Sequence, residues 1–488
     1  MHPPVAGSSR EEWASRGLAS VGAALIAIVL LVAGCSTPRG DDGGPNTTPA
    51  ASTTAPGNTG QPFAQPPELR SANGVLRVTL TAEEREVTIA GVTVRGRVFN
   101  GSFVAPTLRL QPGDRLEVTL VNKLPQMTNL HTHGFHVSPQ ANSDNVFRMV
   151  DPGATATYVY ELSRDFSPGT YWYHPHMHGE VESQIFGGMS GVIIVEGLPR
   201  YLPAGLRDVE ERTISLKDFQ HKDGAIPARN IDSDAPTTRV VNGLRNPAMT
   251  IRPGETQLWR LANIGADIWY QVALQQHRFH IIAEDANPVS RVWAADSLVL
   301  PPGKRYDVLV QAGPAGQVAL ETQAFDQGGD QYPRATLATV QVAGAQVEPA
   351  DLPVEFAPAD DLSTVTVDRR RTLVFTEEDK ANKFFIDGKQ FDPNRIDQLV
   401  GLNGVEEWTI RNQTSELHPF HIHVNDFQVQ SVNQQPFRAR SWADVVPLPI
   451  KGEVVVRMRF RNFTGKYVYH CHIVAHEDLG MMAVVDVT

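Results

Sequence analysis

Apolar and polar residues alternate along most of the chain from Val75 onward. The runs VLRVTL, EVTIAGVTVRGRVF and LRLQPGDRLEVTLVN follow this period of two, and Pro-Gly and Asn-Gly pairs interrupt the pattern. Successive side chains of a strand point to opposite faces of a sheet, so the alternation predicts short strands, and the closely spaced turns predict antiparallel neighbours. Long helical patterns are absent after residue 34. The pattern therefore predicts an all-β protein.

One β unit occurs three times. Residues 106–122 (PTLRLQPGDRLEVTLVN) return as residues 247–263 (PAMTIRPGETQLWRLAN), and a shorter copy (GVEEWTIRN) occupies residues 404–412. Each copy ends in an asparagine, and the copies lie roughly 140–150 residues apart, the length of one β-sandwich domain. We therefore predict three consecutive Greek-key β-sandwiches at residues 68–200, 205–346 and 350–488. The repeated asparagines are Asn122, Asn263 and Asn412.

The composition excludes two classes of protein. The chain has 488 residues, a net charge of −11 and two cysteines, Cys35 and Cys471. Two cysteines are too few for a disulfide-rich secreted scaffold. The acidic balance argues against nucleic acid as a partner, because phosphate binding needs clustered Lys and Arg. Each cysteine therefore needs an explanation of its own.

The chain begins with the layout of a secretory signal. Leu18–Gly34 (LASVGAALIAIVLLVAG) is uncharged and apolar, follows a charged head and ends in small residues before Cys35. This order of regions predicts a signal peptide at residues 1–34, and the run is at the short limit for a membrane span. Val32–Cys35 (VAGC) resembles the lipobox of bacterial lipoproteins, which implies that Cys35 carries a lipid. A plain signal peptide and an uncleaved anchor are the alternatives.

Residues 35–67 are rich in Ser, Thr, Pro, Gly and Asn and nearly free of apolar side chains. Such a segment cannot offset the entropy that it would lose on ordering, so we predict a disordered linker. A lipid anchor, a linker and a folded body together predict an exported protein of the cell envelope, held at the membrane surface outside the cytoplasm.

Histidines gather in the first and third predicted sandwiches. The chain has 16 histidines, and eight of them form four separate His-x-His pairs. Residues i and i+2 of a strand share a face, so each pair presents two imidazoles side by side, as a metal cluster requires. Neutral imidazole binds Zn, Cu, Fe and Ni, so the ligand type leaves the metal open. The pairs are His131 and His133, His174 and His176, His421 and His423, and His470 and His472.

Cys471 indicates which metal binds. It lies between His470 and His472, so its side chain points to the opposite face of the same strand. Two His, one Cys thiolate and a weak axial Met form a blue-copper electron-transfer site. The tripeptide would then join that site covalently to the imidazoles on the other face. The residues that can complete the site are His418, His476 and Met481.

Four motifs together resemble those of the multicopper oxidase family, which includes laccases, bilirubin oxidases, cuprous oxidases and ferroxidases. They are HTHG at 131–134, WYHPHMHG at 172–179, HPFHIH at 418–423 and HCHIVAHEDLGMM at 470–482. The resemblance covers roughly residues 75–488. It implies three cupredoxin-like domains, about four copper ions per chain, and the transfer of electrons from a small reductant to O2.

The resemblance also implies a role for each ligand position. The type 1 copper ligands would be His418, Cys471, His476 and Met481. The type 2 ligands would be His131 and His421, and the type 3 pair would be held by His133, His174, His176, His423, His470 and His472. The outer sandwiches then supply every ligand, so a monomer suffices. The second sandwich, where the pairing is lost at His277 and His280, is expected to serve as a spacer.

Reduction of O2 to water consumes protons, so acids are expected near the cluster. Glu477 matches a family position credited with proton delivery, and Asp144, downstream of the HTHG motif, is a second candidate. His136 and His178 follow ligand motifs and are expected to support the ligands rather than to bind metal.

The sequence indicates the reducing substrate less clearly than it indicates the metal sites. The nine methionines form no Met-rich insert of the kind found in cuprous oxidases, and the sequence assigns no acidic docking cluster for Fe(II). We predict laccase-like oxidation of phenols and aromatic amines, with cuprous or ferrous oxidation as the alternative. A copper nitrite reductase would not need four His-x-His pairs, and a copper carrier would need only the Cys471 site.

Overall fold

The computed structural model describes residues 60–229, 231, 235–358, 360–378 and 382–488. The predicted signal peptide and most of the predicted linker lie outside these residues. Within them, the α-helices are the short α1 (Val181–Gly187) and α2 (Val474–Asp478), and neither these nor any other described helix is long and apolar enough to cross a membrane. Single 3-10 turns are η1 (Leu198–Tyr201), η2 (Ala204–Leu206) and η3 (Leu362–Thr364).

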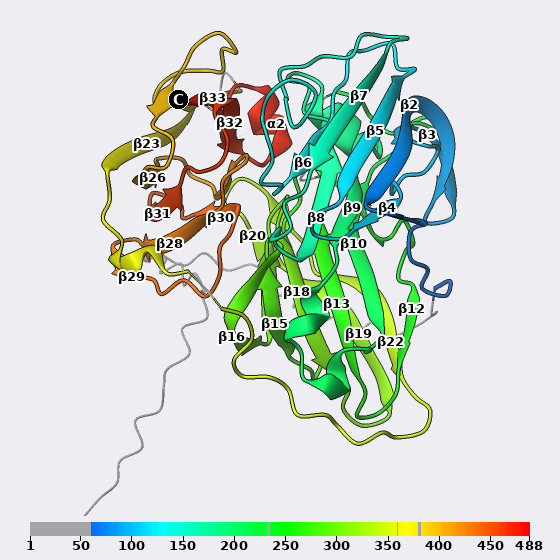
Figure 1. Cartoon of the computed structure of the whole chain (residues 1–488). Helices are drawn as coiled ribbons and strands as arrows, with labels where there is room; N and C mark the ends of the chain where they lie inside the picture. The colour runs from blue at the N-terminus through cyan, green and yellow to red at the C-terminus, as the bar shows by residue number, and fades with distance from the viewer. Residues whose placement is uncertain (1–59, 230, 232–234, 359, 379–381) are drawn as a thin grey trace, which may run out of the picture. The chain divides into compact units, whose positions relative to one another are not determined.

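The first sandwich has a five-stranded sheet, β1-β4-β9-β8-β6, and a four-stranded sheet, β3-β2-β5-β7. Alternate side chains of β5 are buried, and they meet apolar residues of the other sheet in one core. Figure 1 shows these strands in blue to blue-green. Their bounds are β1 Glu68–Arg70, β2 Val75–Ile89, β3 Val92–Phe99, β4 Thr107–Leu110, β5 Arg115–Asn122, β6 His131–His133, β7 Thr155–Glu161, β8 Gly169–His174 and β9 Gly191–Val195.

The second sandwich has a six-stranded sheet, β11-β10-β13-β18-β15-β16, a five-stranded sheet, β12-β22-β19-β14-β17, and the small pair β20-β21. Its core is built around the buried Trp259 and Trp269. The bounds are β10 Glu211–Phe219, β11 Thr238–Val241, β12 Ala248–Ile251, β13 Thr256–Asn263, β14 Tyr270–Leu274, β15 Phe279–Glu284, β16 Asn287–Ala295, β17 Ser297–Leu300, β18 Arg305–Gln311, β19 Gly316–Gln323, β20 Phe325–Asp326, β21 Gln331–Tyr332 and β22 Ala335–Val342.

The third sandwich has a six-stranded sheet, β24-β23-β26-β31-β28-β29, and a five-stranded sheet, β25-β33-β32-β27-β30. Its core contains Trp408, Phe420 and Cys471, so the predicted type 1 site is part of the packed interior. The bounds are β23 Arg369–Glu378, β24 Lys383–Ile386, β25 Gln398–Val400, β26 Val405–Asn412, β27 His418–Ile422, β28 Phe427–Val432, β29 Gln435–Pro436, β30 Val445–Leu448, β31 Glu453–Arg459, β32 Gly465–Cys471 and β33 Met482–Val487.

The repeated asparagines have the same structural role in all three sandwiches. Each is buried and ends its strand, β5, β13 or β26. The Asn122 amide donates to the carbonyls of Gln126 and Val150, and its Oδ1 accepts from the Leu124 amide. Asn263 and Asn412 make the corresponding bonds in their own loops. In the outer sandwiches, this loop leads directly into a strand with candidate ligands, β6 or β27.

The prediction of antiparallel neighbours is wrong for at least one strand pair in each of the six larger sheets, and for two pairs in the first, where β1 also runs parallel to β4. β2 runs parallel to β5, β10 to β13 and β23 to β26, and β4-β9, β12-β22 and β25-β33 are likewise parallel. Alternation of apolar and polar residues determines which face of a sheet a side chain occupies, but it carries no information on strand direction. The crossovers of the chain between two sheets determine that direction.

The last residues of the predicted linker are ordered against the second sandwich. The Gly60 amide donates to the Asn246 carbonyl at 3.1 Å, and the Phe63 amide donates to the Ala248 carbonyl at 2.8 Å. This short segment thus continues the edge of the β12 sheet before the chain enters the first sandwich. Backbone hydrogen bonds to a sheet edge do not require apolar side chains, which is why composition did not indicate them.

Candidate metal centres

The four His-x-His pairs lie at the contact between the first and third sandwiches. In the first sandwich β6 pairs with β8, which sets His131 opposite His174. In the third, β27 pairs with β32, which sets His421 opposite His470. All eight imidazoles are buried. The predicted grouping of histidines from both ends of the chain is therefore present as one cluster of side chains.

The cluster divides into three groups of imidazole nitrogens, and within each group the nitrogens lie within 4.8 Å of one another. Each group draws histidines from both outer sandwiches, so neither sandwich holds a complete set. Sequence alone placed six histidines in the type 3 pair without dividing them, and the structure divides these six into two triads. The triads are His133, His174 and His472, and His176, His423 and His470; the third group is His131, His133 and His421.

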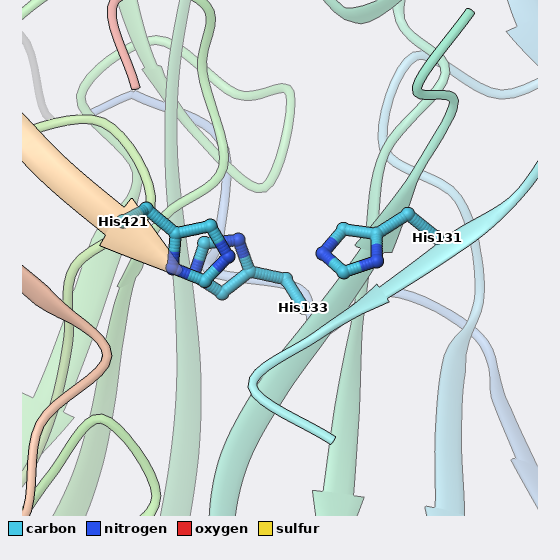
Figure 2. Close-up of side chains that lie close together, drawn as sticks. All are labelled: His131, His133 and His421. Atoms are coloured by element: carbon cyan, nitrogen blue, oxygen red, sulfur yellow. The ribbon is translucent and has the colours of Figure 1, made fainter. Parts of the chain in front are cut away.

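Figure 2 shows His421 and His133 with overlapping rings and His131 approaching from the side. The His133 and His421 ring centroids lie 3.8 Å apart with the planes 13° from parallel. His131 stacks in the same way on His423, at 3.8 Å and 12°. Each stack thus pairs one histidine of the first sandwich with one of the third.

Five of the eight imidazoles have a buried nitrogen without a hydrogen-bond partner among the described residues, and in three of these the nitrogen is Nε2. Nδ1 of His174 lies 2.8 Å from the Pro175 carbonyl, and Nδ1 of His421 lies 2.8 Å from the Asp444 carbonyl. A carbonyl only accepts, so each Nδ1 carries the proton and each Nε2 holds a lone pair. These two Nε2 atoms and that of His131 are buried without a hydrogen-bond partner in the described residues. Such an arrangement fits a bound metal ion, because metals are held by neutral imidazoles whose other nitrogen is fixed by an acceptor.

Electrostatics also favour neutral imidazole throughout the cluster. Burial lowers the pKa of all eight histidines, and the neighbouring imidazoles lower most of them further. The pKa of His174 falls to about 3 and that of His470 to about 4. Protons therefore do not compete with a metal for these nitrogens near neutral pH.

The second candidate centre lies on the other face of β32. Cys471 Sγ lies 3.4 Å from His418 Nδ1 and 3.9 Å from His476 Nδ1, and the two Nδ1 atoms lie 3.4 Å apart. Met481 is fully buried in the same core, and its backbone hydrogen-bonds to both Cys471 and His476. The donor set of two imidazoles, a thiol and a nearby thioether fits a blue-copper site.

One edge of this second centre faces outward. The His476 side chain is 14% exposed, whereas those of His418, Cys471 and Met481 are fully buried. Phe384 stacks on the His476 ring at 3.9 Å, and the Thr414 hydroxyl lies 2.8 Å from His418 Nε2. Burial also raises the pKa of the Cys471 thiol, so a bound cation would be needed to stabilise its thiolate.

Both predicted acids lie beside the eight-histidine cluster. Asp144 Oδ2 lies 2.9 Å from His131 Nδ1, and its Oδ1 accepts from the Thr132 amide at 2.9 Å. Burial raises the pKa of Asp144 to about 7, although the bonds from Thr132 oppose the shift. The structure thus places a carboxyl that can exchange a proton near neutral pH directly behind a ligand imidazole.

Glu477, on α2, is fully buried between two candidate ligand imidazoles. Its Oε1 lies 3.3 Å from His176 Nδ1, and its Oε2 lies 3.1 Å from His470 Nδ1. Burial, reinforced by Asp478, raises the pKa of Glu477 well above its ordinary value. A carboxylic acid at this position keeps a proton within reach of the cluster.

The remaining histidines serve packing and hydrogen bonding. His136 Nδ1 lies 2.7 Å from the Val424 carbonyl, so it joins the first sandwich to the third. His178 packs edge-on to Phe391. His277 accepts a hydrogen bond from the Gly313 amide, and His280 is half-buried on β15.

The second sandwich, predicted to hold the outer sandwiches in register, also places residues against the cluster itself. Gly303 lies against the cluster: a Cβ at this position would stand 3.0 Å from His472 Cδ2 and 3.1 Å from His133 Cε1. Arg305 and Asp444 also lie behind the cluster, and His133 Nε2 lies 3.1 Å from Asp444 Oδ1. No local pattern identifies these residues, because they meet the histidines only through the packing of three sandwiches.

An acidic pair that the sequence did not assign lies beside His418 and His476. Glu416 Oε1 lies 3.6 Å from His418 Nε2 and 3.5 Å from His476 Nε2, and Glu377 Oε2 lies 3.8 Å from His418 Nε2. Burial and the nearby Glu377 raise the pKa of Glu416 to about 8, although the Gln327 amide opposes the shift. The two carboxyls come from strands β23 and β27 and their flanks, so only folding brings them together.

Comparisons with known proteins agree with this architecture. Sequence models of multicopper oxidases match residues 81–199, 210–342 and 364–488. The protein named multicopper oxidase mco of Staphylococcus haemolyticus is 28% identical over 404 residues, covering 80% of this chain and 83% of the relative. Laccase-2 of Botryotinia fuckeliana is 27% identical over 482 residues, covering 82% and 80%. The solved multicopper oxidase of Campylobacter jejuni, described as a metallo-oxidase, is 25% identical with a TM-score of 0.78, covering 88% and 96%. The likeness spans all three sandwiches.

Proposed function

This chain belongs to the multicopper oxidase family and is a copper-dependent oxidoreductase, and from that premise we propose that it couples oxidation of a small reductant to the four-electron reduction of O2 to water. The observation that carries the proposal is the position of Cys471 on β32. Its thiol belongs to the outer site, whereas the adjacent His470 and His472 belong to the eight-histidine cluster. An electron that enters at the thiol therefore has a covalent path to the cluster.

The donor atoms of both sites fit copper. The outer site would hold one ion between His418, Cys471 and His476, with the Met481 thioether as a further candidate ligand. In the cluster, the type 2 ion would be held by His131 and His421, and the two triads would each hold one ion of the type 3 pair. Bound copper supplies one-electron redox chemistry at the outer site and O2 reduction at the cluster.

The chain's acids would supply protons to the cluster. Glu477 holds its proton between His176 and His470, and Asp144 exchanges a proton behind His131. A carboxyl that gives its proton to the cluster has to recover one from solvent before the next turnover. We therefore assign both residues to proton delivery.

The acidic pair Glu377 and Glu416 favours a metal cation as the reductant. Both carboxyls lie within 4 Å of the outer nitrogens of the two type 1 imidazoles, at the edge where His476 is exposed. A cation that displaces the proton of Glu416, whose pKa burial raises to about 8, would bind carboxylate oxygens directly, whereas an uncharged phenol can only donate a hydrogen bond to them. We therefore place Cu(I) or Fe(II) oxidation ahead of the phenol oxidation that the sequence predicts. Phenols and aromatic amines are the second candidate, which the similarity to a laccase favours.

Steady-state kinetics of the copper-loaded protein with Fe(II), Cu(I) and a phenol separate these candidates. We expect Glu416→Gln to lower kcat/KM for the metal ion by at least about tenfold and to change that for the phenol much less. The control is Glu355→Gln, since that side chain is 77% exposed in the segment between β22 and β23. An equal loss with all three reductants would contradict cation docking at Glu416, and a phenol preferred by the wild type would favour the second candidate.

We also propose that Cys35 carries a lipid that holds the exported protein at the membrane surface. The support is the sequence VAGC at the end of the apolar run, in a segment that lies outside the described residues. Cell fractionation of Cys35→Ala should release the protein from the membrane fraction while its oxidase activity is retained. Unchanged association with the membrane would rule out the lipid.

A further inference from the structure

A buried ion pair joins the second sandwich to the third behind the eight-histidine cluster. Arg305, the first residue of β18, is fully buried, and its two Nη atoms donate to the two carboxylate oxygens of Asp444 at 2.6 and 2.7 Å. The guanidinium makes two further hydrogen bonds, from Nε to the Thr170 carbonyl and from Nη1 to the Gly303 carbonyl. The guanidinium is therefore held in a single orientation by all three sandwiches.

Asp444 in turn contacts two candidate copper ligands. Its Oδ1 lies 3.1 Å from Nε2 of His133, and its backbone carbonyl accepts from Nδ1 of His421. Burial raises the pKa of Asp444 to about 7, and the bidentate pair with Arg305 opposes this shift and favours the ionised carboxylate. That carboxylate can only accept, so Nε2 of His133 carries the proton opposite it. Nδ1 is then the nitrogen that can bind metal, and it lies 3.2 Å from Nε2 of His472, within the same triad.

We propose that Arg305 is a positioning residue for the type 3 pair: through Asp444 it fixes the tautomer and ring orientation of His133, so that a sandwich without ligands sets the geometry of one copper site. The proposal rests on the proposed function only in taking the triads as copper ligands. It predicts that loss of the guanidinium disturbs the coupled pair and leaves the type 1 site, on the other face of β32, intact.

The competing explanation is that Arg305 only stabilises the contact between sandwiches. The chain offers a matched control in Arg260 on β13, which is also fully buried and donates to Asp307 at 2.9 Å and to Glu211 at 2.8 Å. Arg260 likewise joins two sandwiches, since Asp307 accepts from the Thr170 hydroxyl of the first. Its partners touch no ligand imidazole among the described hydrogen bonds and ion pairs. Loss of either guanidinium leaves buried carboxylates unpaired, so both changes should destabilise the fold to a similar degree.

The test compares Arg305→Met with Arg260→Met after loading with Cu(II), by copper content and by electron paramagnetic resonance (EPR). A coupled type 3 pair gives no EPR signal, so about half of the copper in the wild type should be visible. We expect Arg305→Met to raise the visible fraction or to lose about one copper per chain, with the blue absorption retained, whereas Arg260→Met should match the wild type. Equal behaviour of the two variants would overturn the proposal.

If Arg305→Met does not fold, Arg305→Lys and Arg260→Lys replace the two methionine variants in this test. One ammonium cannot make the two parallel bonds to Asp444, so Arg305→Lys should show an intermediate change in the visible fraction. A wild-type spectrum from Arg305→Lys would overturn the proposal. A wild-type protein that binds no coupled copper pair would instead contradict the proposed function, so the two failures are distinguishable.

Discussion

Cys471 Sγ lies 3.4 Å from His418 Nδ1, on the opposite face of β32 from the imidazoles that flank it in sequence. One strand thereby serves two sites. We expect Cys471→Ser to abolish the blue absorption and the oxidation of every reductant, because an alcohol oxygen does not replace a soft thiolate at a blue-copper site. The cluster on the other face should keep about three copper ions. Absorption and copper analysis check this, and a variant that stays blue would contradict the assignment of Cys471.

A substitution in the eight-histidine cluster should, conversely, leave the Cys471 site intact. His131→Ala removes a nitrogen of the cluster but leaves His418, Cys471 and His476 unchanged, so the blue band should persist. A reductant should then bleach the band once, and O2 should not restore it, since electrons have no route to O2. His277→Ala is the control, because its ring hydrogen-bonds with Gln275 and Gly313 in loops of the second sandwich. Stopped-flow reoxidation measures the difference, and a recovery rate within about threefold of the wild type would contradict a role in O2 reduction.

The sequence indicates features that are local in the chain, and it misses those created by packing. Asn122, Asn263 and Asn412 end equivalent strands and make the same loop bonds, so the threefold repeat was visible in advance. The His-x-His pairs were equally visible, because the period of a strand places both imidazoles on one face.

Contacts between sandwiches cannot be recognised from a local pattern in the sequence. Arg305 and Asp444 are 139 residues apart and belong to different sandwiches, yet they share a buried bidentate pair. Within the third sandwich, Glu377 and Glu416 come from separate segments of the chain before both approach His418, so this contact also lacks a local signal. A sequence period reports which face a residue occupies, but it does not report which face of another domain will cover that residue.

Gly303 provides a test of the contact between the second sandwich and the cluster. It adopts a φ of +85°, and an added Cβ would stand 3.0 Å from His472 and 3.1 Å from His133. Gly303→Ala should therefore displace two imidazoles of one triad and lower the copper content and O2 reduction. Gly243→Ala is a matched control, because its φ is +80° and nothing lies within 4 Å of its added Cβ.

Both alanines should cost about 1 kcal/mol of stability from the strained backbone. Only Gly303→Ala should change the copper content, which metal analysis and the visible fraction of copper in EPR measure. If both variants lost copper to the same extent, backbone strain would explain the result and the contact would not matter.

Lys217 provides a test of stability against pH. Its ammonium is buried, with Nζ bonded to the Ile185 carbonyl at 3.0 Å and to the Ser190 hydroxyl at 2.8 Å. Burial lowers its pKa from 10.5 to about 7, and the nearby Asp218 only partly opposes the shift. Between these two values the unfolded chain binds a proton at Lys217 that the folded chain does not. The free energy of unfolding should therefore rise with pH across this window.

Lys217→Met removes this penalty and should raise the free energy of unfolding at pH 7 by about 1–3 kcal/mol. The advantage of the variant should shrink as the pH rises toward 10, because the wild-type lysine is then neutral in both states. Thermal unfolding of the two proteins at several pH values measures the difference, with Lys222→Met, an exposed position on the same sandwich, as the control. An advantage that stays constant from pH 7 to 10 would show that packing, rather than the desolvated ammonium, is responsible.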